Sequence, residues 1–160
     1  MDDISTRDKK GFYQELNSYL KELIRVETDW LANLANSAAL LYLGMDTINW
    51  AGFYLHKNGG LVLGPFQGKP ACVRIGMGKG VCGRSAEKRE VQIVRDVHLF
   101  PGHIACDEAS KSEIVLPIVT NGRLVGVLDI DSPIKARFDE EDAVGLGQFI
   151  AILDRYIAWP

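Results

Sequence analysis

Three thiols and three carboxylates are the side chains of this chain best suited to carry chemistry. The thiols lie at Cys72, Cys82 and Cys106. Because the polar, acidic start MDDISTRDKK shows no secretory signal, we expect a reducing compartment, where grouped thiols are catalytic or bind metal more often than they form structural disulfides. The carboxylates, here called the carboxylate triad, are Glu113, Asp129 and Asp131. Thiols beside clustered carboxylates indicate redox chemistry on a small polar molecule.

The register of a hairpin predicted over residues 113–130 decides whether the carboxylate triad meets. Gly122 permits two loop types. A two-residue turn would set Glu113 opposite Ile130 and split the triad. A three-residue loop with a left-handed glycine would set Glu113 opposite Asp129 and gather the triad on one face. Burying a lone carboxylate among apolar side chains is costly, so we favour the three-residue loop.

A gathered triad would have unusual protonation. Three close carboxylates cannot all ionise cheaply, so the pKa of at least one is expected to be raised. Such a group can bind a ligand ammonium, and the acid that stays neutral can donate a proton. The alternative is that the three side chains are solvated at strand ends, and the residues alone leave both interpretations open.

A glycine-rich segment, GMGKGVCG, covers residues 76–83. It lacks the Gly-Lys-Ser/Thr ending of a P-loop and does not match the dinucleotide fingerprint. Its backbone amides could hold a small anion such as a carboxylate where the next helix begins. Equally, the glycines could serve only to make a tight turn.

A zinc site is the alternative use of the thiols. His103 lies three residues before Cys106, and Cys72 and Cys82 could complete a set of three cysteines and one histidine. The sequence contains no Cys-x2-Cys pair and the gaps between the thiols are irregular. We therefore expect no metal.

Composition excludes several classes of protein. The net charge of −3, the pI near 5.6 and the lack of a basic stripe argue against a nucleic-acid partner. No apolar run approaches the roughly 20 residues needed to span a bilayer, so we expect a cytoplasmic protein with no membrane partner. A chain of 160 residues with 47% hydrophobic content is most simply one domain.

Hydrophobic periodicity predicts helices at both ends of the chain and a sheet between them. Two helices are expected at about 8–43, with Thr28 capping the second, and a closing helix at about 139–157, capped by Asp139. Segments rich in β-branched and aromatic residues predict a mostly antiparallel sheet at about 47–131. The fold class is α+β, with the N- and C-terminal helices packed on one sheet face. The long helices could support a homodimer, and a monomer fits as well.

Two apolar stripes define the faces of the N-terminal helices that we expect to be buried. The first comprises Phe12, Leu16, Tyr19, Leu20, Leu23 and Ile24. The second comprises Leu31, Leu34, Ala35, Ala38 and Leu41. Stripes of this kind are typical of packing surfaces rather than of cofactor sites.

Three segments make the chain resemble a known family. NWAGFYL, GKGVCG and the hairpin sequence LDIDS are similar to those of GAF domains. The three cysteines at these spacings, together with the carboxylate triad, resemble specifically the free methionine-R-sulfoxide reductases. The likeness runs from about Thr47 to the closing helix, and the preceding helices also fit. It implies a single GAF domain over residues 1–160.

The resemblance also implies an activity and a role for each site residue. Free L-methionine-R-sulfoxide would be reduced to methionine, with Cys106 attacking the sulfoxide sulfur and becoming a sulfenic acid. Cys72 would resolve that acid as an intramolecular disulfide, and Cys82 would be an auxiliary thiol that passes the oxidation outward. The carboxylate triad would bind the substrate and help protonate its oxygen, while Trp50 and Tyr54 would form an aromatic wall. Thioredoxin, with electrons ultimately from NADPH, would restore the thiols without a bound cofactor.

Two other functions stay open at this point. One is a GAF domain that binds a small ligand without turnover, although three carboxylates in the pocket would repel a phosphate group. The other is a thiol redox sensor in which a disulfide between Cys72 and Cys106 alters an interface. Replacing Cys106 separates these functions from the enzyme, because only an enzyme loses turnover.

Overall fold

A computed structural model describes residues 8–160, so the polar first seven residues lie outside it. In chain order its elements are α1 (Lys9–Ile24), α2 (Trp30–Gly44), β1 (Trp50–Lys57), β2 (Gly60–Gly68), β3 (Arg74–Gly76), α3 (Gly80–Lys88), β4 (Gln92–Val94), a 3-10 turn (Val97–Leu99), β5 (Ser112–Thr120), β6 (Arg123–Ser132) and α4 (Glu140–Tyr156). Among the described residues, no helix has both the length and the apolar character that a membrane crossing requires.

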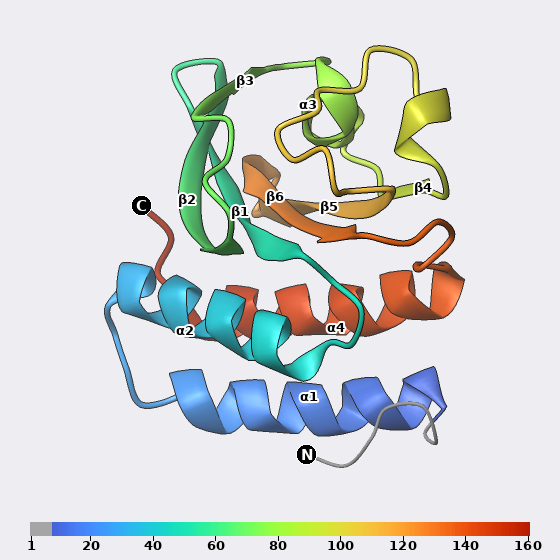
Figure 1. The fold of residues 1–160 in the computed structure, drawn as a ribbon. Coiled ribbons are helices and arrows are strands. Elements are labelled where there is room, and N and C mark those ends of the chain that lie inside the picture. Colours follow the sequence, from blue (N-terminus) through green and yellow to red (C-terminus); the bar gives the residue numbers. More distant parts are fainter. Residues whose placement is uncertain (1–7) are drawn as a thin grey trace.

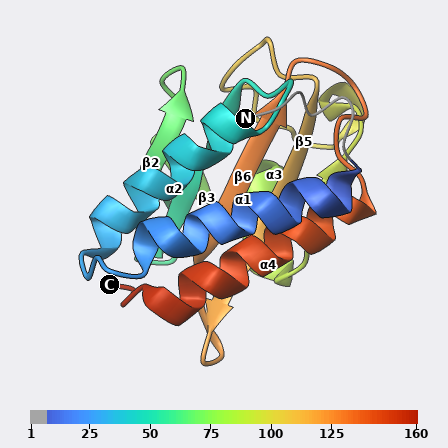
Figure 2. The same ribbon diagram turned by 90° about the horizontal axis from the view of Figure 1, so that it is seen from below.

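The strands form one antiparallel sheet in the order β3-β2-β1-β6-β5-β4. Helices α1, α2 and α4 cover one face, and α3 lies with the long loops on the other (Figure 1). Helix α1 is outermost and contacts both α2 and α4 (Figure 2). The α+β class, with the N- and C-terminal helices on one sheet face, is therefore confirmed.

The central strands contribute to two separate cores because successive side chains of a strand point to opposite faces. On the helical face, Phe53, Ile114 and Leu128 are fully buried among the residues of α1, α2 and α4. On the other face, Tyr54 and Val127 are buried in a second cluster that includes residues of α3. The second face holds the polar side chains discussed below.

The β5–β6 hairpin differs from the three-residue loop that we favoured. Thr120 pairs with Arg123 across a two-residue turn, and both turn residues have positive φ, as a type I′ turn requires. The strands then shift by one residue, because Val125 is an extra residue of β6 that has no partner in β5. The shift sets Glu113 opposite Asp131, a pairing that neither simple loop produces.

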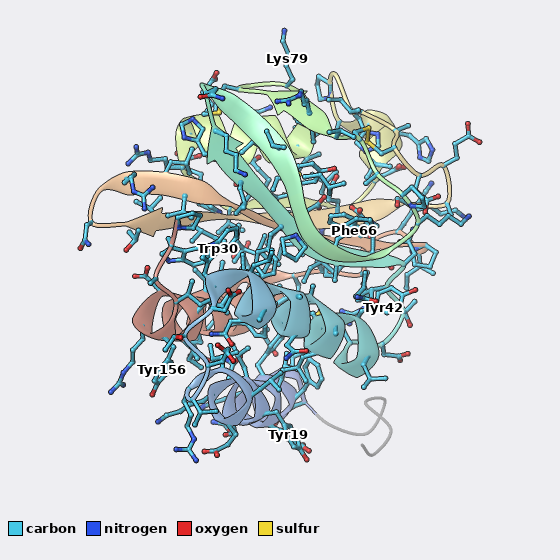
Figure 3. The ribbon with its side chains drawn as sticks, turned by 90° about the vertical axis from the view of Figure 1, so that its left-hand side faces the viewer. Tyr19, Trp30, Tyr42, Phe66, Lys79 and Tyr156 are labelled. Atoms are coloured by element: carbon cyan, nitrogen blue, oxygen red, sulfur yellow. A yellow bond between two sulfur atoms is a disulfide. The ribbon has the colours of Figure 1, made fainter. Side chains whose placement is uncertain are left out.

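The N-cap predicted for the second helix was wrong, and the buried stripes were predicted only in part. Helix α2 is capped by Asp29 rather than Thr28, since the Asp29 side chain accepts a hydrogen bond from the backbone N–H of Ala32 at 2.9 Å. Tyr19 is 56% exposed and points away from the protein (Figure 3). Leu23, Leu31 and Ala35 are exposed as well.

Two polar residues of α2 that were not part of the predicted stripe, Asn33 and Ser37, are buried. Each satisfies itself locally: the Asn33 amide donates to the carbonyl of Glu27 at 2.9 Å, and the Ser37 hydroxyl donates to the carbonyl of Asn33 at 2.7 Å. Because these bonds remove the cost of burying polar groups, the packed face of α2 is rotated from the one that hydrophobicity alone indicated.

A buried aspartate joins α1 to the start of α4. Asp142 accepts a 2.7 Å hydrogen bond from the Tyr13 hydroxyl and a 2.6 Å bond from the Lys9 ammonium. It also forms a capping box with Asp139, which confirms the predicted cap of the closing helix. One carboxylate thus fixes both the start of α4 and the position of α1.

Close packing at Gly145 allows a stability test. A Cβ at this position would overlap the ring of Tyr13 on α1, whereas a Cβ at Gly147, on the exposed side of the same helix, would meet nothing. Gly145→Ala should therefore lower the free energy of unfolding by about 1–3 kcal/mol. Gly147→Ala is the matched control and should leave stability unchanged or raise it by up to about 1 kcal/mol, because alanine favours helix. Equal effects in urea denaturation would contradict this packing.

Candidate active site

A cavity of about 50 Å³ lies on the sheet face that carries the second core, and several residues of that core line it. Strands β1, β5 and β6 form its floor, while the start of α3 and the loop of residues 95–111 enclose it. Its lining includes all the sequence-predicted site residues except Cys72, namely Trp50, Tyr54, Cys82, Cys106, Glu113, Asp129 and Asp131. Cys72 reaches the site through a covalent bond described below.

The carboxylate triad is gathered on the cavity floor. Glu113 faces Asp131 across the β5–β6 ladder, and Asp129 lies two residues along the same face of β6. Glu113 and Asp129 are buried, with 6% and 5% of their surfaces exposed, and Asp131 is partly buried. The solvated alternative is therefore wrong.

Burial makes the three carboxyls differ in protonation. It raises the pKa of Glu113 well above the ordinary value, and the charges of Asp129 and Asp131 raise it further. Burial also raises the pKa of Asp131 well above its ordinary value, and the charge of Asp129 adds to the effect. The pKa of Asp129 is raised by burial too, but hydrogen bonds from Glu113 and Cys82 oppose the rise. Asp129 is therefore the carboxyl that ionises most readily, whereas burial favours the neutral forms of Glu113 and Asp131.

One oxygen of Asp129 is available for a ligand. Among the described residues, Asp129 Oδ1 has no hydrogen-bond partner although it is buried. A buried carboxylate oxygen left without a donor is costly, which favours a bound cation that donates hydrogen bonds.

A disulfide joins Cys72, just before β3, to Cys106 in loop 95–111, with the two Cα atoms 5.7 Å apart. This pairing is the one that the resemblance implied. In this structure two of the four ligands considered for zinc, Cys72 and Cys106, are therefore bonded to each other. His103, proposed for that set, instead places Nε2 3.8 Å from Glu113 Oε1, and burial lowers the pKa of its imidazole.

The third thiol, Cys82, lies apart from the disulfide in the first turn of α3 and is buried. Its Sγ is 4.0 Å from Glu113 Oε2. Burial raises the pKa of this thiol well above the ordinary value, and the charges of Asp129 and Glu113 raise it further. Cys82 is therefore a protonated thiol beside the carboxylate triad.

The aromatic wall is built on β1. Trp50 and Tyr54 stack with ring centroids 5.9 Å apart. Phe66 of β2, which is labelled in Figure 3 and which sequence reasoning missed, stacks on Trp50 with centroids 5.2 Å apart. The Trp50 indole donates to the carbonyl of Lys69 at 3.2 Å. The Tyr54 hydroxyl donates to the carbonyl of Cys72 at 2.8 Å, which ties the wall to the disulfide.

Asn49 anchors the loop that carries Cys106. Its amide donates to Asp107 Oδ2 at 3.1 Å and to Ser110 Oγ at 3.0 Å. Sequence reasoning missed this contact, and the available signal was the place of Asn49 at the start of NWAGFYL, directly before the aromatic wall. The bond holds the loop against β1 from the residue that precedes Trp50.

The glycine-rich segment both turns the chain and lines the cavity. Gly78 has φ of 75° and its N–H donates to the carbonyl of Gly83 at 2.8 Å, which closes the turn into α3. Lys79, the N-cap of α3, makes no side-chain capping bond and points away from the protein (Figure 3). Because Gly80 and Val81 line the cavity, the uncapped start of α3 offers backbone N–H groups there.

The raised pKa of Glu113 predicts that the stability of the protein depends on pH. Because its folded-state pKa is raised, the protein should lose stability as the pH rises above the ordinary value of 4.5 toward the raised one. We expect oxidised, substrate-free Glu113→Gln to melt at a higher temperature than wild type near about pH 8, with the gap closing toward about pH 4. Glu108→Gln, a change at an exposed loop residue, is the control and should follow wild type. A gap independent of pH would contradict the raised pKa.

Comparison with known proteins agrees with this geometry. The GAF domain family matches residues 20–153. The free methionine-R-sulfoxide reductase of Escherichia coli is 54% identical over 151 residues, which cover 94% of this chain and 92% of that protein. The enzyme of the same name from Saccharomyces cerevisiae is 42% identical over 94% of this chain and 88% of its own.

A solved structure extends the likeness to the backbone. The free methionine-R-sulfoxide reductase of Neisseria meningitidis, in complex with its substrate, superposes with a TM-score of 0.91 at 45% identity. The match covers 98% of this chain and 94% of that one. With this overlap in sequence and backbone, the chain belongs to the GAF-domain family and, within it, to the free methionine-R-sulfoxide reductases.

Proposed function

We propose that this chain reduces free methionine-R-sulfoxide to methionine and stores the oxidation as the disulfide between Cys72 and Cys106. The observation that carries the proposal is the position of this disulfide, which places Cys106 in the wall of a cavity whose floor is a buried carboxylate triad. A thiol able to give up electrons, an acid able to give up a proton and a carboxylate able to hold a cation thus share one cavity.

The cavity supports recognition of a free amino acid. The unpartnered Oδ1 of Asp129 is suited to the ammonium group, and the uncapped N-terminus of α3 is suited to the carboxylate at the other end of the amino acid. The stacked rings of Trp50 and Tyr54 offer an apolar surface for the S-methyl group. In a peptide the amine of methionine sulfoxide is acylated and carries no positive charge, so the site would exclude peptides. The Escherichia coli and Saccharomyces cerevisiae relatives are named as reductases of the R epimer, which supports the same preference here.

The first chemical step transfers two electrons from Cys106 to the sulfoxide. The Cys106 thiolate attacks the sulfoxide sulfur while Glu113, kept protonated by burial, donates its proton to the oxygen. The hydroxyl group then transfers to the Cys106 sulfur as the S–O bond of the substrate and the transient bond between the two sulfur atoms both break. Methionine leaves, and Cys106 becomes a sulfenic acid. Neighbouring carboxylates oppose a thiolate at Cys106, and the substrate ammonium offsets that effect by neutralising their charge.

The second step protects Cys106 from further oxidation. The Cys72 thiol attacks the sulfenic sulfur, a water molecule leaves, and the disulfide seen in this structure forms. A dithiol protein of the thioredoxin class, with electrons ultimately from NADPH, then returns both thiols by exchange, so the cycle needs no bound cofactor. Such a cycle suits a reducing compartment such as the cytoplasm.

Two cysteine variants test the order of these steps. Cys106→Ser should lower methionine formation by more than about 10³-fold, because the nucleophile is lost. Cys72→Ser should release about one methionine per chain and then stop, because its sulfenic acid has no resolving thiol. Chromatography of methionine after addition of free methionine-R-sulfoxide, with and without thioredoxin, measures both.

His98→Asn is the control for these variants, since His98 lies on the same loop as Cys106 but outside the cavity lining, and should cycle like wild type. Multiple turnovers by Cys72→Ser would exclude Cys72 as the resolving thiol. Turnover by Cys106→Ser would place the nucleophile elsewhere.

A redox sensor is the second candidate, because the same disulfide would form in a protein that only reports oxidation. Wild-type protein that forms the disulfide with peroxide, yet releases no methionine from the sulfoxide, would favour this function.

A further inference from the structure

Cys82 is a buried thiol that the proposed reaction does not use. It lies in the first turn of α3 with 4% of its surface exposed, packed in the second core with Val81, Ala86 and Ile75. The disulfide is already complete without it. Its place in the site therefore needs an explanation other than bond formation with Cys72 or Cys106.

The contacts of Cys82 are with the carboxylate triad. Its Sγ lies 4.0 Å from Glu113 Oε2, within reach of an S–H···O hydrogen bond. Sγ and one oxygen each of Glu113 and Asp129 all lie within 4.8 Å of one another. The thiol thus lies beside both Glu113, whose neutral form burial favours, and Asp129, which ionises more readily.

The surroundings of Cys82 oppose thiol–disulfide exchange. Exchange needs a thiolate and a path for the attacking sulfur. Here the thiol is buried, and the adjacent carboxylates disfavour a second negative charge. The same surroundings favour a neutral S–H that donates to a carboxylate oxygen and occupies space that water would otherwise fill.

We propose that Cys82 is a positioning residue, whose thiol stays reduced throughout the cycle and holds the Glu113 and Asp129 carboxyls in the arrangement that receives the substrate ammonium. This inference rests on the proposed function and assigns redox cycling to Cys72 and Cys106 alone. It differs from the auxiliary redox role that the resemblance implied for Cys82.

The first test asks which of the three thiols is still free after one turnover. Reduced wild-type protein receives one equivalent of free methionine-R-sulfoxide without a reductant, is then unfolded and alkylated, and is mapped by mass spectrometry. Cys82 should carry the label at every time point, whereas the labels on Cys72 and Cys106 should disappear as their disulfide forms. Cys82→Ala should continue to turn over with thioredoxin, whereas Cys72→Ser stops after the first methionine.

Steady-state kinetics supply the second test. Removing one hydrogen bond to the cluster should raise KM for the free sulfoxide by about 3- to 10-fold in Cys82→Ala with little change in kcat. Cys82→Ser, which keeps a donor in place, should recover most of the lost affinity. Ala86→Gly, a change in the same core away from the carboxyls, should lower the melting temperature and leave KM unchanged, which separates positioning from loss of stability.

Three results would overturn the proposal. A label on Cys72 or Cys106, with Cys82 in a disulfide, would make Cys82 a redox thiol. Cys82→Ala that stops after one methionine would have the same meaning. An unchanged KM in Cys82→Ala would remove the positioning role. Wild-type protein that releases no methionine at all would refute the proposed function as well, whereas the other outcomes leave that function intact.

Discussion

An extra residue at Val125 shifts β6 by one position against β5, and this shift sets Asp131 opposite Glu113 with Asp129 on the same face. The core on the helical face holds this register in place, because a slip by one residue would turn Ile130 and Leu128 away from the helices and the carboxylates toward them. Packing on one side of the sheet thus stabilises an electrostatically costly arrangement on the other.

The chemistry follows from that cost. Carboxyls buried together share protons unequally, so one cluster can supply both the acid and the acceptor for a cation that the proposed reaction needs. Loop 95–111 brings Cys106 to the same cavity and is held against β1 by Asn49. Tyr54 completes the connection, since its ring lies in the wall and its hydroxyl binds the carbonyl of Cys72. The carboxylates and the aromatic wall therefore lie on neighbouring strands of one sheet, and contacts from Asn49 and Tyr54 hold the two bonded cysteines beside them.

Sequence reasoning reached most of the fold and the site residues, and its errors have physical causes. Hydrophobic periodicity located the helices and the sheet, but it could not show that Asn33 and Ser37 would satisfy their own polar groups and be buried. The prediction that the carboxylate triad gathers on one face was correct, although the three-residue loop from which it was argued was wrong. A bulge leaves no mark in hydrophobic alternation, so Val125 could not be identified from the residues alone.

The disulfide pairing and the aromatic wall came from family resemblance, not from spacing, because 34 residues separate Cys72 from Cys106 and only tertiary structure brings them together. Asn49 and Phe66 were missed for the same reason. Each contacts residues distant in the sequence, Asn49 the loop residues Asp107 and Ser110 and Phe66 the ring of Trp50, and neither residue type is distinctive in the sequence.

The central claim is that the buried carboxylate triad binds the ammonium group of a free amino acid while Cys106 reduces its sulfoxide. The most direct measurement is NADPH consumption with thioredoxin and thioredoxin reductase, offering free methionine-R-sulfoxide, the S epimer and N-acetylated methionine-R-sulfoxide in parallel. The account predicts turnover on the free R epimer alone. Equal turnover on the N-acetylated compound would contradict it, because that substrate carries no ammonium for the cluster to bind.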